Sequence, residues 1–217
     1  MKIDTNTVNV LKNFSKINPS IVVQQGNVLK TISPNKTIMA KATVPTEFTK
    51  KFAIYDLNQF LSSLSLYNDP DLEIDETFVY MKDSSSEQGK FLLADESTIT
   101  KAPEKDINIP STDVTFTLKN EDLIKVEKAA GVLSLPEIVV AGDGKTVFLK
   151  AANSKNPGNE FSLPIGETTK TFNAVFKFEN IKILPGDYEV TISARGISKF
   201  IGKDVEYFIA VEQHSTF

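Results

Sequence analysis

Short runs of apolar and β-branched residues, separated by polar turn residues, make up most of this 217-residue chain. Apolar and polar positions alternate within many of these runs, which is the period of a strand with one buried face. The connecting turns are short, so we expect antiparallel pairing. The pattern predicts strands at residues 21–24, 28–32, 37–43, 48–54, 72–74, 77–82, 90–94, 114–118, 137–141, 146–151, 160–164, 171–178, 188–193, 197–201 and 205–211.

Two of the turns carry glycine and predict hairpins. Gly142-Asp143-Gly144 separates the strands at 137–141 and 146–151. Gln25-Gly26-Asn27 separates those at 21–24 and 28–32. Glycine accepts the positive φ angles that tight hairpin turns require, so each pair of strands is expected to fold back on itself.

Helical spacing occurs in four segments. Residues 57–66 have Leu57, Phe60, Leu61 and Leu64 on one face, directly after Asp56, which is a suitable N-cap. The other predicted helices cover residues 5–17, 120–131 and 180–184, and Pro185 with Gly186 keeps the last one short.

A weak repeat divides the chain. The form Phe-x-apolar-x-(Asp or Asn) begins at Phe52, Phe116 and Phe176, each time just before a predicted helix, and chance is the alternative explanation. With the first helix included, the chain forms four helix-plus-strands units. A polar stretch at 96–111 that contains two prolines is expected to connect two domains, residues 1–95 and 112–217.

Composition restricts the chemistry. The chain has no Cys, so disulfides, thiol nucleophiles and Cys-bound metals are excluded, and its one His, His214, lies near the C-terminus, where chains usually fray. No apolar run reaches the ~20 residues that span a bilayer, and the N-terminus lacks a signal-peptide pattern. The net charge of −4 predicts that any contact with nucleic acid uses a local basic surface.

Two motifs favour ordinary structural interpretations. Gly144-Lys145-Thr146 is similar to the end of a phosphate-binding loop, but Val139 occupies the position of the first glycine and strands flank the turn. The acidic residues Asp69, Asp71, Glu73, Asp75 and Glu76 could suggest a cation site. Alternation across Leu72 and Ile74 instead favours the wet face of a strand.

Basic residues follow the predicted helices. Asn9, Lys12, Asn13 and Lys16 form a polar stripe on the first helix, Lys119, Lys125 and Lys128 accompany the third, and Lys182 lies on the fourth. They are either ordinary solvated faces or parts of one basic surface. In the connector, Ile107 and Ile109 either pin the chain to a sheet or line a groove for a partner peptide.

The chain resembles the DNA polymerase sliding clamps of T-even-type bacteriophages and their cyanophage relatives. The resemblance extends over essentially the whole sequence, and its most specific part is AIYDLN at residues 53–58. Further matching segments are Leu11-Lys12-Asn13-Phe14, Leu64-Ser65-Leu66, Asn68-Asp69, Pro185-Gly186 and Ser215-Thr216-Phe217.

This resemblance implies an α+β DNA-clamp fold with two similar domains, each of two helix-plus-antiparallel-strands units. Three chains would form a ring, with helices lining the hole and sheets outside. The ring would encircle duplex DNA and tether the replicative DNA polymerase, with the excess acidic charge on its outer surface. The edge strands at 90–94 and 160–164 are expected to join neighbouring chains.

The resemblance also assigns site residues. DNA-facing candidates are Lys12, Lys16, Lys119, Lys125, Lys128 and Lys182, whereas the second helix carries no Lys or Arg. The expected partner-peptide groove contains Ile32, Ile107, Ile109, Pro110, Phe208 and Ala210.

No catalytic residue, metal or cofactor is expected. A clamp loader is a further expected partner, late-transcription factors are candidate partners, and the expected location is the cytoplasm of the infected bacterial host. The alternative function is a β-rich viral structural or interaction protein that does not encircle DNA.

Overall fold

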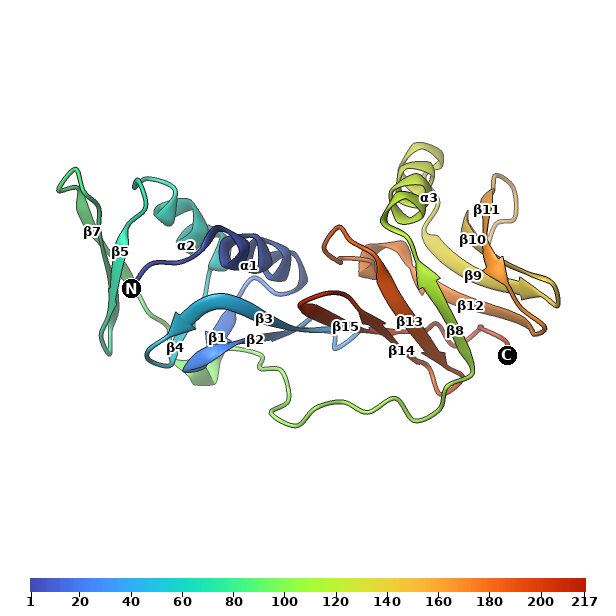
Figure 1. Ribbon diagram of the computed structural model, residues 1–217, viewed down its shortest axis with the longest axis horizontal. Helices are drawn as coiled ribbons and strands as arrows, with labels where there is room; N and C mark the ends of the chain where they lie inside the picture. The colour runs from blue at the N-terminus through green and yellow to red at the C-terminus, as the bar shows by residue number, and fades with distance from the viewer. The chain divides into compact units, whose positions relative to one another are not determined.

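The computed structural model describes residues 1–217 and divides them into two compact units, Met1–Lys105 and Asp106–Phe217 (Figure 1). The boundary falls within the range that the sequence predicts as a connector. Three α-helices and two short 3-10 helices accompany the strands: α1 (Thr5–Ile17), α2 (Leu57–Leu64), α3 (Asn120–Leu133), η1 (Glu96–Thr98) and η2 (Phe178–Asn180). None of these helices is long and apolar enough to cross a membrane.

Unit 1 contains three sets of antiparallel strands: β1 with β4, β2 with β3, and a meander in the order β5-β6-β7. Their bounds are β1 (Ile21–Val23), β2 (Gly26–Ile32), β3 (Ile38–Phe48), β4 (Phe52–Ile54), β5 (Asp71–Ile74), β6 (Phe78–Lys82) and β7 (Gln88–Leu92).

The two helices of unit 1 begin at carboxylate caps. Asp4 accepts a hydrogen bond from Asn6 N–H at the start of α1, and Asp56 accepts one from Gln59 N–H at the start of α2. Helix α1 buries Leu11, Phe14 and Ile17, and it packs on β3 and against α2. Both helices therefore bury one apolar stripe and leave the opposite face exposed.

Unit 2 contains two four-strand arrays, β11-β10-β9-β12 and β15-β14-β13-β8, all antiparallel. Helix α3 packs on β9, β10 and β11. The bounds are β8 (Val114–Leu118), β9 (Glu137–Asp143), β10 (Thr146–Ala152), β11 (Phe161–Glu167), β12 (Thr171–Lys177), β13 (Tyr188–Ser193), β14 (Ile197–Ile201) and β15 (Val205–Ala210).

Three of the predicted helices are confirmed, but the prediction of a fourth over residues 180–184 is wrong. A short 3-10 helix, η2 (Phe178–Asn180), instead ends at the first residue of this segment, and Ile181 has already left helical geometry, with ψ at 74°. Five residues before a proline form too few intrahelical hydrogen bonds to offset the cost of nucleation. Lys182 therefore does not lie on a helix.

The strand predictions need two corrections. The hairpin across Gln25–Asn27 is wrong, because β1 pairs with β4 and Gly26 itself begins β2 opposite Phe48. The predicted break after residue 43 is also absent, since β3 runs through Pro45. Pro45 lies on the exposed face beside a register shift in β2, where its missing N–H is not needed.

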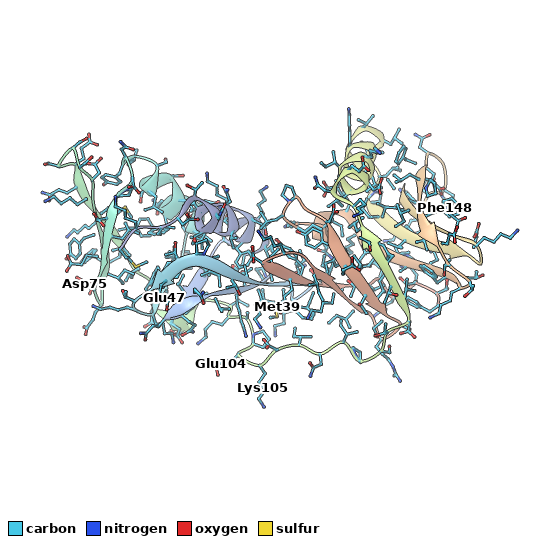
Figure 2. All side chains as sticks on the ribbon, in the orientation of Figure 1. Met39, Glu47, Asp75, Glu104, Lys105 and Phe148 are labelled. Atoms are coloured by element: carbon cyan, nitrogen blue, oxygen red, sulfur yellow. The ribbon has the colours of Figure 1, made fainter.

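The connecting segment is attached to each unit by side chains. At its start, Asn18 Nδ2 donates to Thr100 O at 3.2 Å and Lys30 Nζ donates to Glu104 O at 2.8 Å. At its end, Ser111 Oγ lies 2.6 Å from Ser193 Oγ. The side chains of Glu104 and Lys105 point away from the sheets (Figure 2).

Candidate nucleic-acid interface and partner surfaces

Helix α1 carries two exposed lysines, Lys12 and Lys16, that form no ion pair. The helix contains no acidic residue, so neither ammonium group is neutralised by its own helix. Asn13, which the sequence places in the same polar stripe, is instead 5% exposed, and that part of the prediction is wrong. Its position one turn before Ile17 places it on the buried side of α1.

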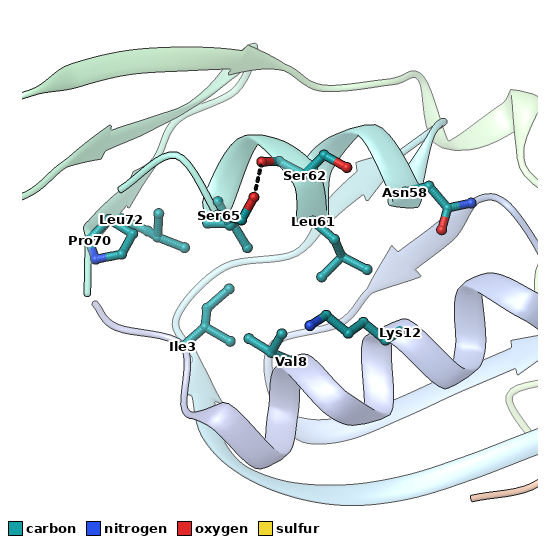
Figure 3. A pocket seen from close by; sticks show the side chains of 10 residues that line it. Ile3, Val8, Lys12, Asn58, Leu61, Ser62, Ser65, Pro70 and Leu72 are labelled. Carbon is teal, nitrogen blue, oxygen red and sulfur yellow. Dashed lines mark hydrogen bonds between the residues drawn. The ribbon is translucent and has the colours of Figure 1, made fainter. Parts of the chain in front are cut away.

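Helix α2 carries no charge and exposes Asn58, Gln59, Ser62 and Ser65. A cleft of about 400 Å³ separates its exposed face from α1 (Figure 3). Lys12 reaches into this cleft from α1, while Asn58 and Ser62 border it from α2. No single-helix pattern in the sequence could reveal it, because its two walls come from segments about 50 residues apart.

Helix α3 differs in its charge balance. Lys125 Nζ lies 3.9 Å from Glu121 Oε2 and 3.8 Å from Asp122 Oδ1, so acidic groups of the same helix offset its charge. Lys128 is exposed and forms no ion pair. The predicted basic stripe on α3 therefore has one unpaired lysine.

Lys119 precedes α3 and donates to Asp187 Oδ2 at 2.8 Å. Asp187 also accepts from Asn120 N–H at 2.9 Å, which makes it the capping carboxylate of α3 from a distant part of the chain. The bond from Lys119, followed by that from Asn120, lowers the pKa of Asp187 below its ordinary value of 3.8. Lys182, the remaining lysine candidate, lies half-buried after η2.

The predicted groove residues lie in both units. Ile107 and Ile109 are half-buried, whereas Asn108 and Pro110 are exposed. Phe208 is buried in β15 under Lys199, whose Nζ is 5.2 Å from the ring centroid, and Ala210 ends the same strand. Ile32 is buried at the end of β2 in unit 1.

A cavity that the sequence did not predict lies within unit 1, beneath the first part of the connector. It measures about 390 Å³. Val22 and Val28 line one side, and Ala102 and Pro103 line the other. The cavity depends on the path of the connector over β1 and β2, which no local sequence pattern specifies.

Each unit also has a strand with an unpaired edge. Strand β7 pairs only with β6, and β11 pairs only with β10. Leu92 at the end of β7 is 64% exposed. Two open edges on one chain are suited to contacts with further copies.

The acidic residues around β5 behave as the strand interpretation predicts. Asp71 and Glu73 are exposed, whereas Leu72 and Ile74 are buried. Asp75 accepts from Thr77 and Phe78 N–H groups, both at 2.6 Å, and these bonds lower its pKa. No group of three or more His, Asp or Glu side chains in the chain is placed to hold a metal ion.

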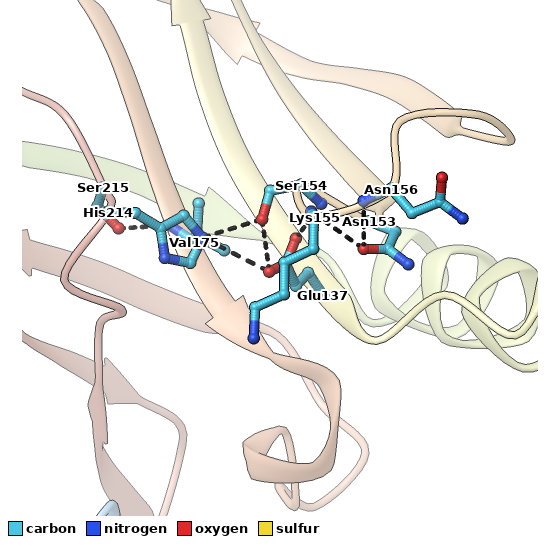
Figure 4. Close-up of polar contacts among 8 residues, drawn as sticks. All are labelled: Glu137, Asn153, Ser154, Lys155, Asn156, Val175, His214 and Ser215. Carbon is cyan, nitrogen blue, oxygen red and sulfur yellow. Dashed lines mark hydrogen bonds and ion pairs between the residues drawn. The ribbon is translucent and has the colours of Figure 1, made fainter.

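His214 belongs to a polar cluster in unit 2 (Figure 4). The buried Glu137 carboxylate accepts from Ser154 N–H at 2.7 Å and from Ser154 Oγ at 2.8 Å. His214 Nε2 lies 3.2 Å from Ser154 Oγ and 3.5 Å from Glu137 Oε1. Ser154 and Glu137 therefore both lie near Nε2 of His214. In a catalytic triad the serine and the carboxylate instead bind opposite nitrogens of the histidine ring.

The C-terminal tail is tied to β12, so the expectation that it frays is wrong. Glu212 N–H donates to Val175 O at 2.8 Å, and Asn173 and Thr216 exchange two backbone bonds. Ser215 Oγ accepts from Val175 N–H at 2.9 Å (Figure 4). The tail thus covers the outer edge of β12, a long-range pairing that composition does not indicate.

Comparisons with known proteins agree with this geometry. Two family descriptions match consecutive parts of the chain: "DNA polymerase processivity factor" over residues 3–101 and "gp45 sliding clamp, C terminal" over residues 115–213. The sliding clamp of Vibrio phage KVP40 is 36% identical over 98% of this chain and 99% of its own length. That of Escherichia phage RB69 is 35% identical over 100% and 99%.

Solved structures share the fold at low identity. PCNA of A. fulgidus, bound to the C-terminal region of FEN-1, superposes with a TM-score of 0.69 at 14% identity, covering 94% of both chains. The DNA polymerase III beta chain of Streptococcus pneumoniae gives 0.67 at 10% identity, covering 97% of this chain and 64% of its own. These likenesses confirm the expected clamp fold. With the full-length similarity to phage clamps, they establish that the chain belongs to the sliding-clamp family of DNA polymerase processivity factors.

Proposed function

We propose that three copies of the chain close into a ring around duplex DNA and tether the replicative polymerase to its template. The observation that carries the proposal is the similarity to phage sliding clamps along the full chain. The open edges of β7 and β11 support closure, because a head-to-tail contact between different surfaces forms a ring when its rotation closes.

In this mechanism the ring holds DNA by topology. A closed ring leaves the duplex only by opening or by sliding off an end, so the protein needs little affinity for DNA. Phosphate contacts from a few lysines are then sufficient, despite a net charge of −4 per chain. Lys12, Lys16 and Lys128 are the leading contacts, because they are exposed and unpaired. We assign no catalytic residue or cofactor.

The polymerase would bind through a short peptide with an apolar or aromatic anchor. The proposed groove residues are Ile107, Ile109, Pro110, Phe208, Ala210 and Ile32. Among the connector residues, half-burial supports only Ile107 and Ile109, because it leaves part of each side chain accessible to a partner. The cavity of unit 1 lined by Ala102 and Pro103 offers further apolar surface beside the connector. Aromatic anchors in such pockets dominate small interfaces.

A clamp loader would open and close the ring, and late-transcription factors are further candidate partners. The ring would act in the cytoplasm of the infected bacterial host. Both roles depend on a ring, so the assembly state is the first property to test.

The ring is tested by light scattering of the full chain at micromolar concentration. We expect a trimer in equilibrium with smaller species. Leu92→Asp places a charge at the end of β7 and should shift the mass toward the monomer. Leu66→Asp is the matched control, because Leu66 is 73% exposed but lies outside the edge strands. A strictly monomeric wild type, or equal effects of the two substitutions, would contradict the proposed assembly.

A further inference from the structure

We propose that the cleft between α1 and α2 holds one phosphodiester of the encircled duplex, with Lys12 supplying charge and Asn58 and Ser62 supplying hydrogen bonds. This inference rests on the proposed function, since it takes duplex DNA as the partner. It assigns a DNA contact to α2, a helix without a single basic residue.

Three side chains in the cleft, those of Lys12, Asn58 and Ser62, can donate hydrogen bonds and have no acceptor within the chain. Lys12 forms no ion pair, and the side chains of Asn58 and Ser62 have no hydrogen-bond partner in the structure. Ser65 differs, because its Oγ already donates to Ser62 O at 2.7 Å (Figure 3). An ammonium, an amide and a hydroxyl group together match the acceptor oxygens of a phosphate.

The residues that line the cleft include no carboxylate. Neither α1 nor α2 contains Asp or Glu, and none lines the cleft. The two capping residues, Asp4 and Asp56, each accept a backbone N–H at a helix start. Asp69 and Asp71, which flank the lining residue Pro70, pair with Lys2 and with the N-terminal ammonium group. The lining itself therefore offers an anion donors and no carboxylate, in contrast to the surface of α3, where Glu121 and Asp122 flank Lys125.

The apolar residues that line the cleft favour a sugar-phosphate over a free anion. Val8, Leu61 and Leu72 line it, and its volume of about 400 Å³ exceeds that of a single phosphate. A bare anion would leave these apolar side chains uncovered. A deoxyribose attached to the phosphate can cover them with its C–H face while the phosphate oxygens face Lys12.

A double-mutant cycle tests the cleft. The affinity of the full-length clamp for a fluorescent linear duplex is measured by anisotropy at low salt and over a salt series. Asn58→Ala should weaken binding about twofold to tenfold, as expected for the net contribution of one ordinary hydrogen bond. Lys12→Ala should also reduce the salt slope by about 0.9 per lost contact. In the Lys12→Ala background, the effect of Asn58→Ala should largely disappear.

Gln59→Ala is the matched control, since Gln59 is exposed on the same helix but lies outside the cleft. Lys16 with Asn58 is the control pair and should behave additively. Equal losses for Asn58→Ala and Gln59→Ala, or additivity of Lys12 with Asn58, would overturn the inference. Primer extension with the same wild-type preparation distinguishes failure of the cleft from failure of the proposed function. Processive synthesis together with additive effects of Lys12→Ala and Asn58→Ala rejects only the cleft. Absence of processive synthesis rejects the proposed function.

Discussion

At the scale of single residues, ion pairing distinguishes lysines that look equivalent in the sequence. The resemblance to phage clamps assigns six DNA-facing lysines, and the sequence pattern does not rank them. In the structure, Lys119 is bound to Asp187 and Lys125 lies near two acids, whereas Lys12, Lys16 and Lys128 are unpaired. A paired ammonium has to lose its partner before it neutralises a phosphate, so its net contribution to DNA binding is smaller.

We therefore predict unequal effects of lysine removal. Lys16→Ala and Lys128→Ala should each weaken duplex binding and lower the salt slope by about 0.9. Lys125→Ala should change the slope less, because Glu121 and Asp122 already offset that charge. Anisotropy titrations across a salt series measure the slopes. A Lys125 variant that loses as much slope as the other two would show that its ion pairs do not restrict it.

The second residue-scale prediction concerns the cap of α3. Hydrogen bonds from Lys119 and Asn120 lower the pKa of Asp187, so the folded state favours its ionised form. The resulting stability is present above the ordinary carboxyl pKa of 3.8 and is lost as pH falls through the lower folded value. Asp187→Asn should therefore unfold at a lower temperature than wild type at pH 7. Thermal melts near pH 2.5 should show a much smaller difference, and a gap that persists in acid would exclude this linkage.

At the scale of elements, periodicity predicts what is repeated locally and misses what depends on distant partners. The three longer helices follow directly from apolar spacing and, for α2, from its Asp56 cap. The sequence cannot show that β1 pairs with β4, that Asp187 caps α3, or that the tail covers β12. Those features are set by tertiary contacts, which override local propensity. The α1–α2 cleft cannot be predicted from the sequence for the same reason, because it forms between two distant helices. The sequence does predict that Lys12 and Lys16 lie on the first helix.

Strand β9 provides a packing test. A Cβ at Gly142 would lie 2.5 Å from Phe172 Cε1 and 2.6 Å from Lys170 O, and the backbone oxygen cannot rotate away. Gly142→Ala should destabilise the fold by about 1–3 kcal/mol. Gly131→Ala on α3 is the control, since a Cβ there would meet no atom within 4 Å beyond its chain neighbours and the backbone of its own helix, and alanine favours a helix. Denaturant melts should give a lower free energy of unfolding for Gly142→Ala and a higher one for Gly131→Ala than for wild type. A Gly142→Ala variant as stable as wild type would contradict the close contact with Phe172 and Lys170.

The connector gives a prediction for the polymerase contact. Ile109→Ser should reduce binding of the polymerase's C-terminal peptide by about 1 kcal/mol or more, if Ile109 supplies an apolar wall to its anchor. Asn108→Ser is the matched control, because the side chain of this neighbouring residue is exposed. Calorimetry of each variant with the peptide, at unchanged trimer mass, makes the comparison. Unchanged affinity of the Ile109 variant would leave the connector isoleucines with a structural role only.

At the scale of the whole molecule, a ring reconciles an acidic chain with a DNA partner. The acidic excess of four charges per chain excludes broad coating of DNA, and the helices provide only a few unpaired lysines. Encirclement removes the need for strong binding, because retention then depends on ring closure. The account consequently predicts weak binding to short linear duplexes together with a large effect on long synthesis.

Primer extension on a single-stranded circular template, with limiting cognate polymerase and a DNA trap, tests the central claim most directly. With the clamp, its loader and ATP, the account predicts full-length products from single polymerase binding events. Without the clamp, products should remain short. Product lengths that are the same with and without the clamp would contradict the claim that this chain tethers the polymerase.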